Sequence, residues 1–449
     1  LGRNGSPILW AYVIVTSVFM YALPGQEYSI NTAPEVLLLS HLLMWLFHAT
    51  ILPLARAHTP RLKDLCALAM SGPTWVFFVV AGAWLLWRLQ LIYIHGPTAL
   101  MFSRTQVSQS TGISEFSTLE AAVSSITTLL LMGGMAFLVI SHAAGQRRRS
   151  PLVYFTAAAV LVTIVLTNES PIGSRRLVLV LAALWLGVNW LRSELSVARY
   201  IAKHAKQIVT LIVLMGGLTV YYQHIRNNDF SKILAASSPW EFVMATMEFA
   251  APMNAYGDES EVHYLRSGPF DFFARTLDVT LVEGKSTSGE AILFSLVIAV
   301  PKILYPGVKP VGDIDELLLD RLEIYPAKPF LQIDYPTSLP AIGVSDLGPI
   351  GVIGAGAVLS SSFAFVGWLL RRTRAVPVAP ILALGLFVQL IGSQEGGLTA
   401  IVSSLRDALI ALMFLVVFHK VGKLLRGLGR ASRSFASSAA PILVKGKNE

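Results

Sequence analysis

The chain has 449 residues, of which 54% are hydrophobic and only 14% charged, and its mean hydropathy is +0.61. Because runs of about 20 apolar residues recur, this composition excludes an ordinary soluble domain and predicts an all-α polytopic membrane protein. The net charge of +8 is better explained by membrane topology than by nucleic-acid binding, since the basic residues cluster between apolar runs. The single cysteine, Cys66, excludes an intrachain disulfide and a cysteine metal cluster.

About ten apolar runs are long enough to be predicted as membrane-spanning helices, given a hydrocarbon core of about 30 Å. The whole chain, 1–449, is therefore expected to form one integral membrane domain. The first run follows only Arg3 and lacks a small-residue cleavage pattern, which favours a retained span over a cleaved signal peptide. The predicted spans lie near residues 8–23, 33–54, 74–94, 118–141, 151–167, 176–192, 207–222, 348–370, 377–393 and 398–419.

The connections between these spans alternate in charge along the chain. By the positive-inside rule, the face that carries the basic connections is cytoplasmic, so both termini are expected in the cytoplasm. The basic tail, 420–449, is expected to lie at the anionic inner leaflet. The basic connections contain Arg56, Arg61 and Lys63; Arg147 to Arg149; Arg192, Arg199, Lys203 and Lys206; Arg371, Arg372 and Arg374; and Lys420, Lys423 and Arg426.

One long hydrophilic interval, 223–347, is predicted as a periplasmic loop that caps the outer face. Between Tyr221 and Leu347 the chain has 9 basic and 17 acidic residues, a net charge of −8. Residues 239–251 have helical character, with Ser238 as N-cap, and predict an amphipathic helix on the membrane. Residues 291–305 form an apolar run broken by Pro301, which indicates an interfacial or re-entrant helix. The rest of the loop is expected to be an ordered cap of turns.

Arginines occur at the predicted outer face, where the positive-inside rule disfavours them. Arg88 interrupts the third span, where it either faces a cavity or partner or snorkels toward the headgroups. Arg175 and Arg176 open the sixth span at its outer end. A planar, permanently charged guanidinium suits diphosphate oxygens, so these residues predict a lipid-linked phosphate or diphosphate substrate. The same face is expected to carry Arg104, Arg226, Arg266, Arg275 and Arg406.

Carboxylates on this face are candidates for the general base that takes a proton from a sugar hydroxyl. Each of them could equally pair with an arginine. The residues concerned are Asp278, Glu283, Glu290, Asp346 and Glu395. Metal dependence is not indicated, because the one Asp-x-Asp motif, Asp313 to Asp315, lies away from any predicted span end.

Several short motifs resemble the Wzy family of bacterial O-antigen and oligosaccharide repeat-unit polymerases, over roughly residues 85 to 420. Arg104 precedes Gly112 before a span, and Gly173-Ser-Arg-Arg-Leu177 opens another. In the loop, Arg275-Thr-Leu-Asp278 precedes Pro301-Lys-Ile-Leu-Tyr-Pro-Gly-Val-Lys-Pro310, which is similar to the family pattern Ile-Pro-Arg-x-Leu-x-Pro-x-Lys-Pro. Lys302 stands where arginine is usual, and one extra residue precedes Lys309. Leu347-Gly-Pro-Ile-Gly-Val352 resembles the family's Asn-Phe-Gly-x-x-Gly-Val, without the Asn and the aromatic residue. Arg406-Asp407 in the last predicted span is also similar in residue type to the family.

The resemblance implies a GT-C-like, metal-independent inverting glycosyltransferase without a cofactor, at the periplasmic face of the bacterial inner membrane. It would transfer a growing glycan from undecaprenyl diphosphate to an undecaprenyl-diphosphate-linked repeat unit. Expected partners are this lipid-linked oligosaccharide, membrane lipids, a chain-length regulator and a flippase, and no nucleic acid. The expected catalytic carboxylates are Asp278, Glu395 and Glu283. The expected diphosphate and glycan ligands are Arg176 and Arg275, followed by Arg175, Arg104, Arg266, Arg88, Lys302, Lys309 and Arg406.

Three alternatives remain open at this level. An O-antigen ligase would share the topology and the arginine chemistry and differ in its acceptor. A transporter of lipid-linked saccharides would have internal repeats and polar, broken helices at the membrane midplane, and the sequence shows no such repeat. A scaffold subunit that only docks partners would not require arginines at the ends of spans.

Overall fold

The computed structural model describes residues 5–21, 32–71, 75–95, 118–145, 151–167, 174–214, 217, 269–300, 314–324, 338–373, 376, 378–392 and 397–439. These residues are mainly helical, and no strand occurs among them. The all-α prediction is therefore confirmed for this part of the chain. The helices are α1 (Pro7–Tyr21), α2 (Pro34–His58), α3 (Leu62–Ser71), α4 (Trp75–His95), α6 (Thr118–Ala143), α7 (Pro151–Thr167), α8 (Ser174–Ser193), α9 (Val197–Lys203), α13 (Pro269–Val282), α14 (Glu290–Ala299), α15 (Ile314–Leu322), α16 (Leu339–Leu347), α17 (Ile350–Arg372), α18 (Ala379–Gly392) and α19 (Gly397–Ala439).

Helices overlap all ten predicted spans. Five of them are long and apolar enough to cross a membrane: Pro34–His58, Val123–Ala143, Arg176–Ser193, Ile350–Arg372 and Gly397–Val421. The other five predicted spans contain shorter apolar helices, at Pro7–Val18, Phe77–Gln90, Pro151–Leu161, Ala205–Leu214 and Ala379–Gly392. The chain is thus a helical, membrane-embedded protein, while the count of ten spans stays a prediction.

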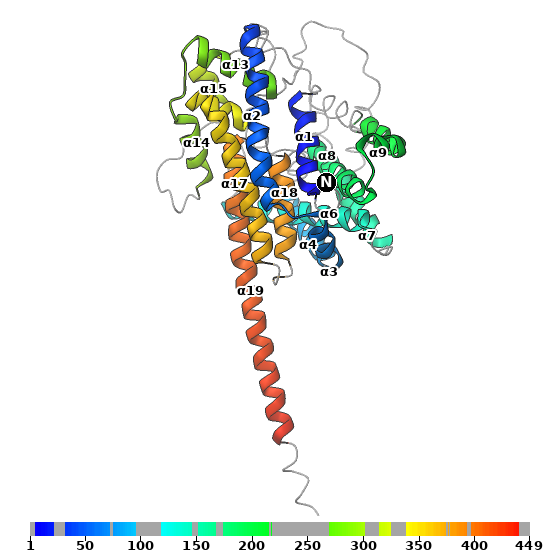
Figure 1. Ribbon diagram of the computed structural model, residues 1–449. Helices are drawn as coiled ribbons and strands as arrows, with labels where there is room; N and C mark the ends of the chain where they lie inside the picture. The colour runs from blue at the N-terminus through cyan, green and yellow to red at the C-terminus, as the bar shows by residue number, and fades with distance from the viewer. Residues whose placement is uncertain are drawn as a thin grey trace, which may run out of the picture.

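The helices α2 and α17 lie side by side because small residues let their backbones approach (Figure 1). A Cβ added at Gly356 of α17 would collide with Thr50 of α2, and one at Gly367 would collide with the backbone carbonyl of His58. Where lipid removes the hydrophobic driving force between helices, small residues such as these glycines favour association because they let the backbones pack closely.

The helices α6 and α18 cross at a pair of glycines. A Cβ at Gly133 of α6 would collide with the carbonyl oxygen of Ile381, and one at Gly385 of α18 with the carbonyl oxygen of Leu129. The two backbones are therefore in direct contact at this crossing, and a side chain on either glycine would force them apart.

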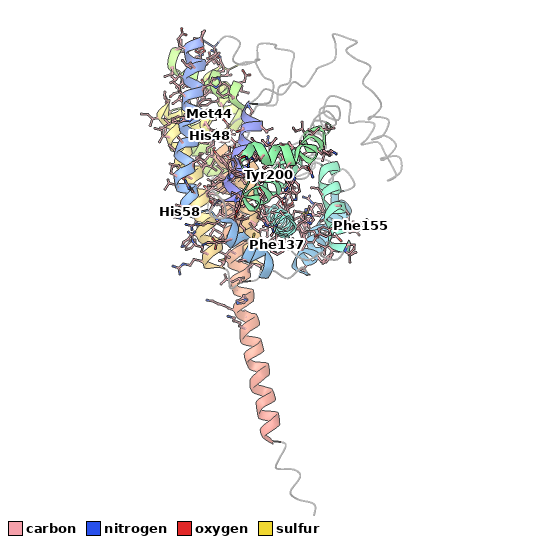
Figure 2. All side chains as sticks on the ribbon, turned by 45° about the vertical axis from the view of Figure 1, so that its right-hand side comes forward. Met44, His48, His58, Phe137, Phe155 and Tyr200 are labelled. Atoms are coloured by element: carbon pink, nitrogen blue, oxygen red, sulfur yellow. The ribbon has the colours of Figure 1, made fainter. Side chains whose placement is uncertain are left out.

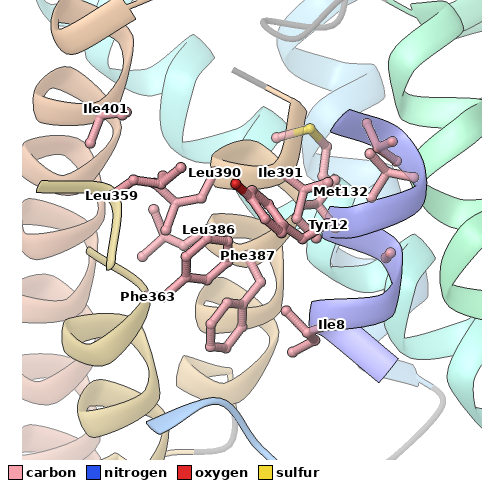
Figure 3. Packing of buried hydrophobic residues seen from close by; sticks show 14 of the residues in the cluster. Ile8, Tyr12, Met132, Leu359, Phe363, Leu386, Phe387, Leu390, Ile391 and Ile401 are labelled. Atoms are coloured by element: carbon pink, nitrogen blue, oxygen red, sulfur yellow. The ribbon is translucent and has the colours of Figure 1, made fainter. Parts of the chain in front are cut away.

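Aromatic and aliphatic side chains from several helices fill the centre of the bundle (Figure 3). The Tyr12 ring of α1 lies edge-on to Phe363 of α17, with 5.6 Å between ring centroids, and Phe363 stacks on Phe387 of α18 at 6.1 Å. The Tyr12 hydroxyl and His48 Nδ1 of α2 are 2.9 Å apart, which satisfies both polar groups in this apolar setting.

Basic helix ends that were predicted to share one face contact one another. Arg371, in the last turn of α17, donates through Nη1 to the carbonyl oxygen of His58 at 3.1 Å, and Figure 2 shows His58 toward the end of α2. Arg192, near the end of α8, donates to the carbonyl oxygen of Ala143 at the end of α6. These contacts agree with the predicted grouping of helix ends, whereas the compartment that they face stays a prediction.

The described parts of the long hydrophilic interval are more helical than the sequence predicted. The expectation that its remainder consists of turns was wrong for α13, α15 and α16, which are three well-formed helices. The apolar run at 291–305 does form a short helix, α14, which ends one residue before Val300 and two before Pro301, where proline removes a helix-forming N–H. The predicted helix at 239–251 lies outside the described residues.

The last helix runs beyond its predicted span. Its apolar part, Gly397–Val421, agrees with the predicted span 398–419, and the helix continues to Ala439 within the predicted basic tail, 420–449. In Figure 1 it leaves the bundle at the end opposite α13 and α15. Alanine, leucine, lysine and arginine favour helix in residues 420–432, but Gly422, Gly427 and Gly429 oppose it, so local propensity alone does not account for the continuation of α19.

Candidate functional site

The four short helices α13 to α16 pack together at one end of the bundle (Figure 1). Helix α13 begins with Pro269, has Asp271 in its first turn, and buries Phe272, Phe273 and Leu277. Proline and an acidic residue both favour the start of a helix, so the local sequence specifies this element well. The helices α14 and α16 also contact α19, and α16 contacts α17, which fixes the group to the apolar helices.

Arg275 of α13 lies between two carboxylates. Its Nη1 donates to Asp278 Oδ2 at 2.5 Å, and its Nη2 donates to Glu283 Oε1 at 2.9 Å. Asp278 is only 5% exposed, so its charge requires this partner. Asp271, also buried, precedes Arg275 by four residues and therefore lies on the same face of α13. The site thus places one guanidinium among carboxylates on one helix face.

Charges of alternating sign continue from this cluster to α15. Lys285 Nζ lies 3.1 Å from Glu283 Oε2 and 2.7 Å from Glu323 Oε2, just after α15. Arg321 of α15 is also paired: its Nε lies 2.9 Å from Oε2 of Glu290, the first residue of α14. The segment between α13 and α14, residues 283–289, is called the α13–α14 connection below. One ion pair, Lys285–Glu323, joins this connection to the residue after α15, and the other, Arg321–Glu290, joins α15 to the first residue of α14.

The pKa values of two groups in this cluster are shifted. The hydrogen bond from Lys285, and then the charges of Arg275 and Lys285, lower the pKa of Glu283, although partial burial opposes them. Hydrogen bonds to Glu323 and Glu283 raise the pKa of Lys285. A carboxylate with a lowered pKa is a weak base, so Glu283 in this arrangement serves as an ion-pair partner rather than a general base.

These shifts predict that the cluster is insensitive to pH across the neutral range. A lowered pKa means that Glu283 stabilises the fold above the ordinary glutamate pKa and loses this effect as pH falls through its lowered pKa. The raised pKa of Lys285 means that its contribution is complete below the ordinary lysine pKa and is lost only as pH rises through the raised one. We therefore expect both ion pairs of Lys285 to persist from about pH 5 to about pH 10, as a minor addition to the packing of the buried Leu318 and Leu322 that attaches α15.

A nitroxide label at Asp320→Cys, in a Cys66→Ser background, would report on this attachment. Its mobility in the electron paramagnetic resonance spectrum should stay constant between about pH 5 and 10 and rise below about pH 4. The matched variant Lys285→Met should show a more mobile label at neutral pH. A transition near pH 7 in the unmodified cluster would contradict the prediction.

Asp346 of α16 is bound by four donors from the α13–α14 connection and α14. Its Oδ1 accepts from the Thr287 hydroxyl, from Gly289 N at 2.9 Å and from Ala291 N at 3.3 Å, and its Oδ2 accepts from Ile292 N at 2.7 Å. Helix α14 has no side-chain cap of its own, so Asp346 supplies the missing acceptor from another helix. Both carboxylate oxygens are occupied, which makes Asp346 a structural group in this arrangement.

Of the predicted site residues, the structure brings Arg275, Asp278 and Glu283 together. Arg176, at the start of α8, instead donates through Nη1 to the carbonyl oxygen of Gly392 at the end of α18, at 3.3 Å. Arg406 of α19 pairs with Asp407 at 2.7 Å and donates to the carbonyl oxygen of Ala299 in α14 at 2.5 Å. Among the described contacts none joins Arg176 or Arg406 to Arg275.

Arg88 of α4 lies above the buried ring of Trp84, with 5.7 Å between the guanidinium carbon and the ring centroid. This is the distance of a cation–π contact, and it places Arg88 on the same face of α4 as a core residue. The side chain of Arg175 lies outside the described residues, as do Arg104, Arg266, Lys302, Lys309 and Glu395.

Sequence reasoning missed Asp271, Lys285, Arg321 and Glu323. Lys285 and Glu323 are 38 residues apart, so no local pattern links them. A usable signal was present only for Asp271, which shares the helical spacing i, i+4, i+7 with Arg275 and Asp278.

Comparisons of the chain with protein-family models, with curated proteins and with solved structures found no match.

Proposed function

We propose that the protein is a membrane-embedded polysaccharide polymerase, a glycosyltransferase that uses polyprenyl-diphosphate-linked donors. It transfers the growing glycan from undecaprenyl diphosphate to the sugar of an undecaprenyl-diphosphate-linked repeat unit at the periplasmic face of the bacterial inner membrane. The proposal rests on the resemblance of the sequence motifs and on one feature of the structure, described next.

The observation that supports the proposal is the position of Arg275 between Asp278 and Glu283, on a layer of short helices at the end of an apolar bundle. This transfer needs a cation for the leaving diphosphate and a carboxylate for the attacking hydroxyl, and both kinds of group lie here within hydrogen-bond distance. Glu283, which is the more exposed of the two partners, is the one that a substrate diphosphate would replace on Arg275.

The reaction forms a bond between a hydroxyl oxygen of the acceptor sugar and the anomeric carbon of the donor glycan. The bond between that carbon and the diphosphate oxygen breaks, and the electron pair leaves with undecaprenyl diphosphate. The hydroxyl proton passes to a carboxylate. Asp278 is the catalytic candidate named from the sequence, and because it is ion-paired with Arg275, its use as the base requires that the diphosphate first takes over Arg275. Arg275 stabilises the charge that develops on the leaving diphosphate, with Arg176 as a second candidate at the start of α8.

The basic helix ends support the proposed orientation. Arg371 and Arg372 end α17 beside His58 at the end of α2, and these ends face the cytoplasm by the positive-inside rule. Helices α13 to α16 lie toward the opposite ends of α2 and α17 (Figure 1), on the side that the proposal assigns to the periplasm. A flippase that delivers the repeat unit and a regulator of chain length are the partners that such a reaction requires.

The proposal is tested by deleting the gene and examining the lipid-linked saccharides of the host cell. Loss of a polymerase should remove long polymer and accumulate single repeat units on undecaprenyl diphosphate, facing the periplasm. Arg275→Ala and Arg176→Ala should fail to restore polymer, whereas Arg372→Ala, an exposed arginine at the other end of α17, should restore it. Accumulation of lipid-linked long polymer would instead identify a ligase, and retention of single units on the cytoplasmic side would identify a transporter. An unchanged saccharide pool would contradict all three functions.

A further inference from the structure

Helix α19 is longer than a membrane is thick. Its 43 residues correspond to about 64 Å at a rise of about 1.5 Å per residue, whereas a hydrocarbon core is about 30 Å thick. The apolar part ends at Val421, and the helix continues to Ala439. Residues 422–439 are called the α19 extension below. Figures 1 and 2 show the extension projecting from the bundle, with no other described helix beside it.

The composition of the α19 extension does not favour an isolated helix. It contains Gly422, Gly427 and Gly429 and four serines, and all of these residues form helix less readily than alanine. Helices of this length are marginal in water even when they are rich in alanine, and helices in proteins are stabilised chiefly by packing of an apolar face. The extension therefore needs an apolar surface to pack against.

Apolar residues recur in the second half of α19 at alternating intervals of four and three residues. They are Ile410, Phe414, Val417, Val421, Leu424, Leu428, Ala431 and Phe435, and they are called the α19 seam below. A helix that packs in a globular core has a wider apolar face, whereas this spacing, kept from residue 410 to residue 435, is typical of a coiled coil.

The part of the seam within the apolar span faces away from the bundle. Phe414, Val417 and Val421 are 53%, 52% and 47% exposed, whereas Ile401 and Ala408 on the opposite face of α19 are buried. Lipid can cover Phe414 and Val417 inside the membrane. It cannot cover the continuation of the same stripe in an extension that leaves the membrane along the axis of α19.

The basic residues of this region lie away from the seam. With Phe414, Val421, Leu428 and Phe435 at heptad position a, the positions c and f are outward positions of a coiled coil. These positions hold Lys423, Arg426, Arg430 and Arg433. Lys420 is at position g, and the e position opposite it in a second parallel copy is Leu425, so the seam brings no like charges together.

This arrangement distinguishes a second helix from the inner leaflet as the surface that covers the seam. A basic helix that lies on the leaflet is held partly by contact between its basic residues and anionic headgroups. In the extension, positions c and f are on the side of the helix opposite the seam, so they would face water if the seam faced lipid. In a coiled coil the same positions face water without loss.

We propose that the α19 extension pairs with the α19 extension of a second copy of this chain, in a parallel coiled coil along the α19 seam. Two copies in one membrane have the same orientation, and a twofold axis along the membrane normal brings equal residues together. The pairing begins at the lipid-facing side of α19 and continues beyond the membrane. It does not depend on the proposed function, and none of the measurements below uses activity.

The first test is oxidative cross-linking of single cysteines in inner-membrane vesicles, in a Cys66→Ser background. A disulfide forms only where two Cα atoms lie within about 7 Å, which in a parallel coiled coil holds for the seam and not for outward positions. Leu424→Cys, Leu428→Cys and Ala431→Cys should therefore give a covalent dimer of twice the 48.7 kDa chain mass. The controls Arg426→Cys and Arg430→Cys should give several-fold less. Equal yields at all five positions, or no dimer at any of them, would overturn the proposal.

The second test separates a partner helix from the lipid surface. A nitroxide at Leu428→Cys should be poorly accessible both to oxygen, which concentrates in lipid, and to a water-soluble nickel chelate, because a second helix covers it. A nitroxide at Arg430→Cys should be accessible to the chelate. High oxygen accessibility at residue 428 would show that the extension lies in the leaflet, and high chelate accessibility there would show an uncovered seam. Either result would contradict the proposed pairing.

The third test breaks the seam in the full-length protein. Leu424→Glu/Leu428→Glu places charges at facing positions, so light scattering in mild detergent should show the mass of one chain instead of two. Arg426→Glu/Arg430→Glu is the matched control, because it changes the charge by more but leaves the seam intact, and it should stay dimeric. Loss of the dimer in both variants, or in neither, would refute the role of the seam.

Discussion

Replacing Arg275 with alanine is expected to reduce polymer formation by about 10²–10³-fold, the usual effect of removing one donor that stabilises a developing charge. Arg275 is half-buried and donates through both terminal nitrogens, so neither water nor a neighbouring lysine can reproduce its planar fork. Arg275→Lys should retain the charge and restore only part of the activity. The measurement is the rate of chain elongation with purified protein and a lipid-linked repeat unit, without added metal.

A loss of activity in Arg275→Ala could also arise from misfolding, because the variant leaves Asp278 buried without its cation. The double variant Arg275→Ala/Asp278→Asn removes this unpaired charge. It should recover the thermal stability of the parent protein, which would assign any instability of Arg275→Ala to the unpaired Asp278. Full elongation in the single variant would exclude Arg275 from the site.

Glu283→Gln is expected to increase substrate affinity, in contrast to the loss of activity expected for Arg275→Ala. It removes one of the two carboxylates that compete with a diphosphate for Arg275, so substrate should bind more tightly. If Glu283 were instead the general base, the same variant would lose catalytic rate. A lower KM with an unchanged kcat thus separates the two roles, and the lowered pKa of Glu283 favours the first.

The sequence predicted the apolar helices well and the short helices of the hydrophilic interval poorly. Long apolar runs are visible without any knowledge of tertiary contacts, and helices begin within three residues of the predicted start for spans such as 348–370. Helix α13 was missed because its apolar residues are interrupted by Arg275 and by Asp271 and Asp278, and the burial of these two acids depends on packing against α2 and α16. Propensity gives little indication of a helix that tertiary contacts stabilise.

The sequence identified several residues of the candidate site, but it did not predict the contacts between segments far apart in the chain. Arg275, Asp278 and Glu283 were identified as chemically suitable residues, and they do contact one another. Asp346 reaches Ile292 across 54 residues, and only the packing of α14 on α16 brings the two together. No sequence pattern distinguishes a carboxylate that caps a distant helix from one that acts as a base, since both are buried acids near arginines.

The crossing of α6 and α18 provides the largest expected effect on stability. Gly133→Ala adds a Cβ that would overlap the carbonyl oxygen of Ile381, and Gly385→Ala one that would overlap that of Leu129. Backbone atoms cannot rotate away as a side chain can, so the two helices have to separate along their contact. Overpacking costs about 1–3 kcal/mol even where side chains can adjust, and we expect these variants to reach or exceed the upper value. The measurement is the fraction of monodisperse protein that remains after heating in detergent.

Gly354→Ala on α17 is the matched control for this prediction. Among the described residues, no atom lies within 4 Å of a Cβ added there, and alanine favours helix over glycine by about 1 kcal/mol. This control should therefore be as stable as the parent protein or slightly more stable, whereas both crossing variants should aggregate at a lower temperature. Equal behaviour of Gly133→Ala and Gly354→Ala would show that α6 and α18 are not in backbone contact. Helix α18 ends at Gly392, whose carbonyl oxygen accepts the hydrogen bond from Arg176. Separation of α6 and α18 should therefore also displace Arg176 and lower the rate of elongation in protein that stays folded.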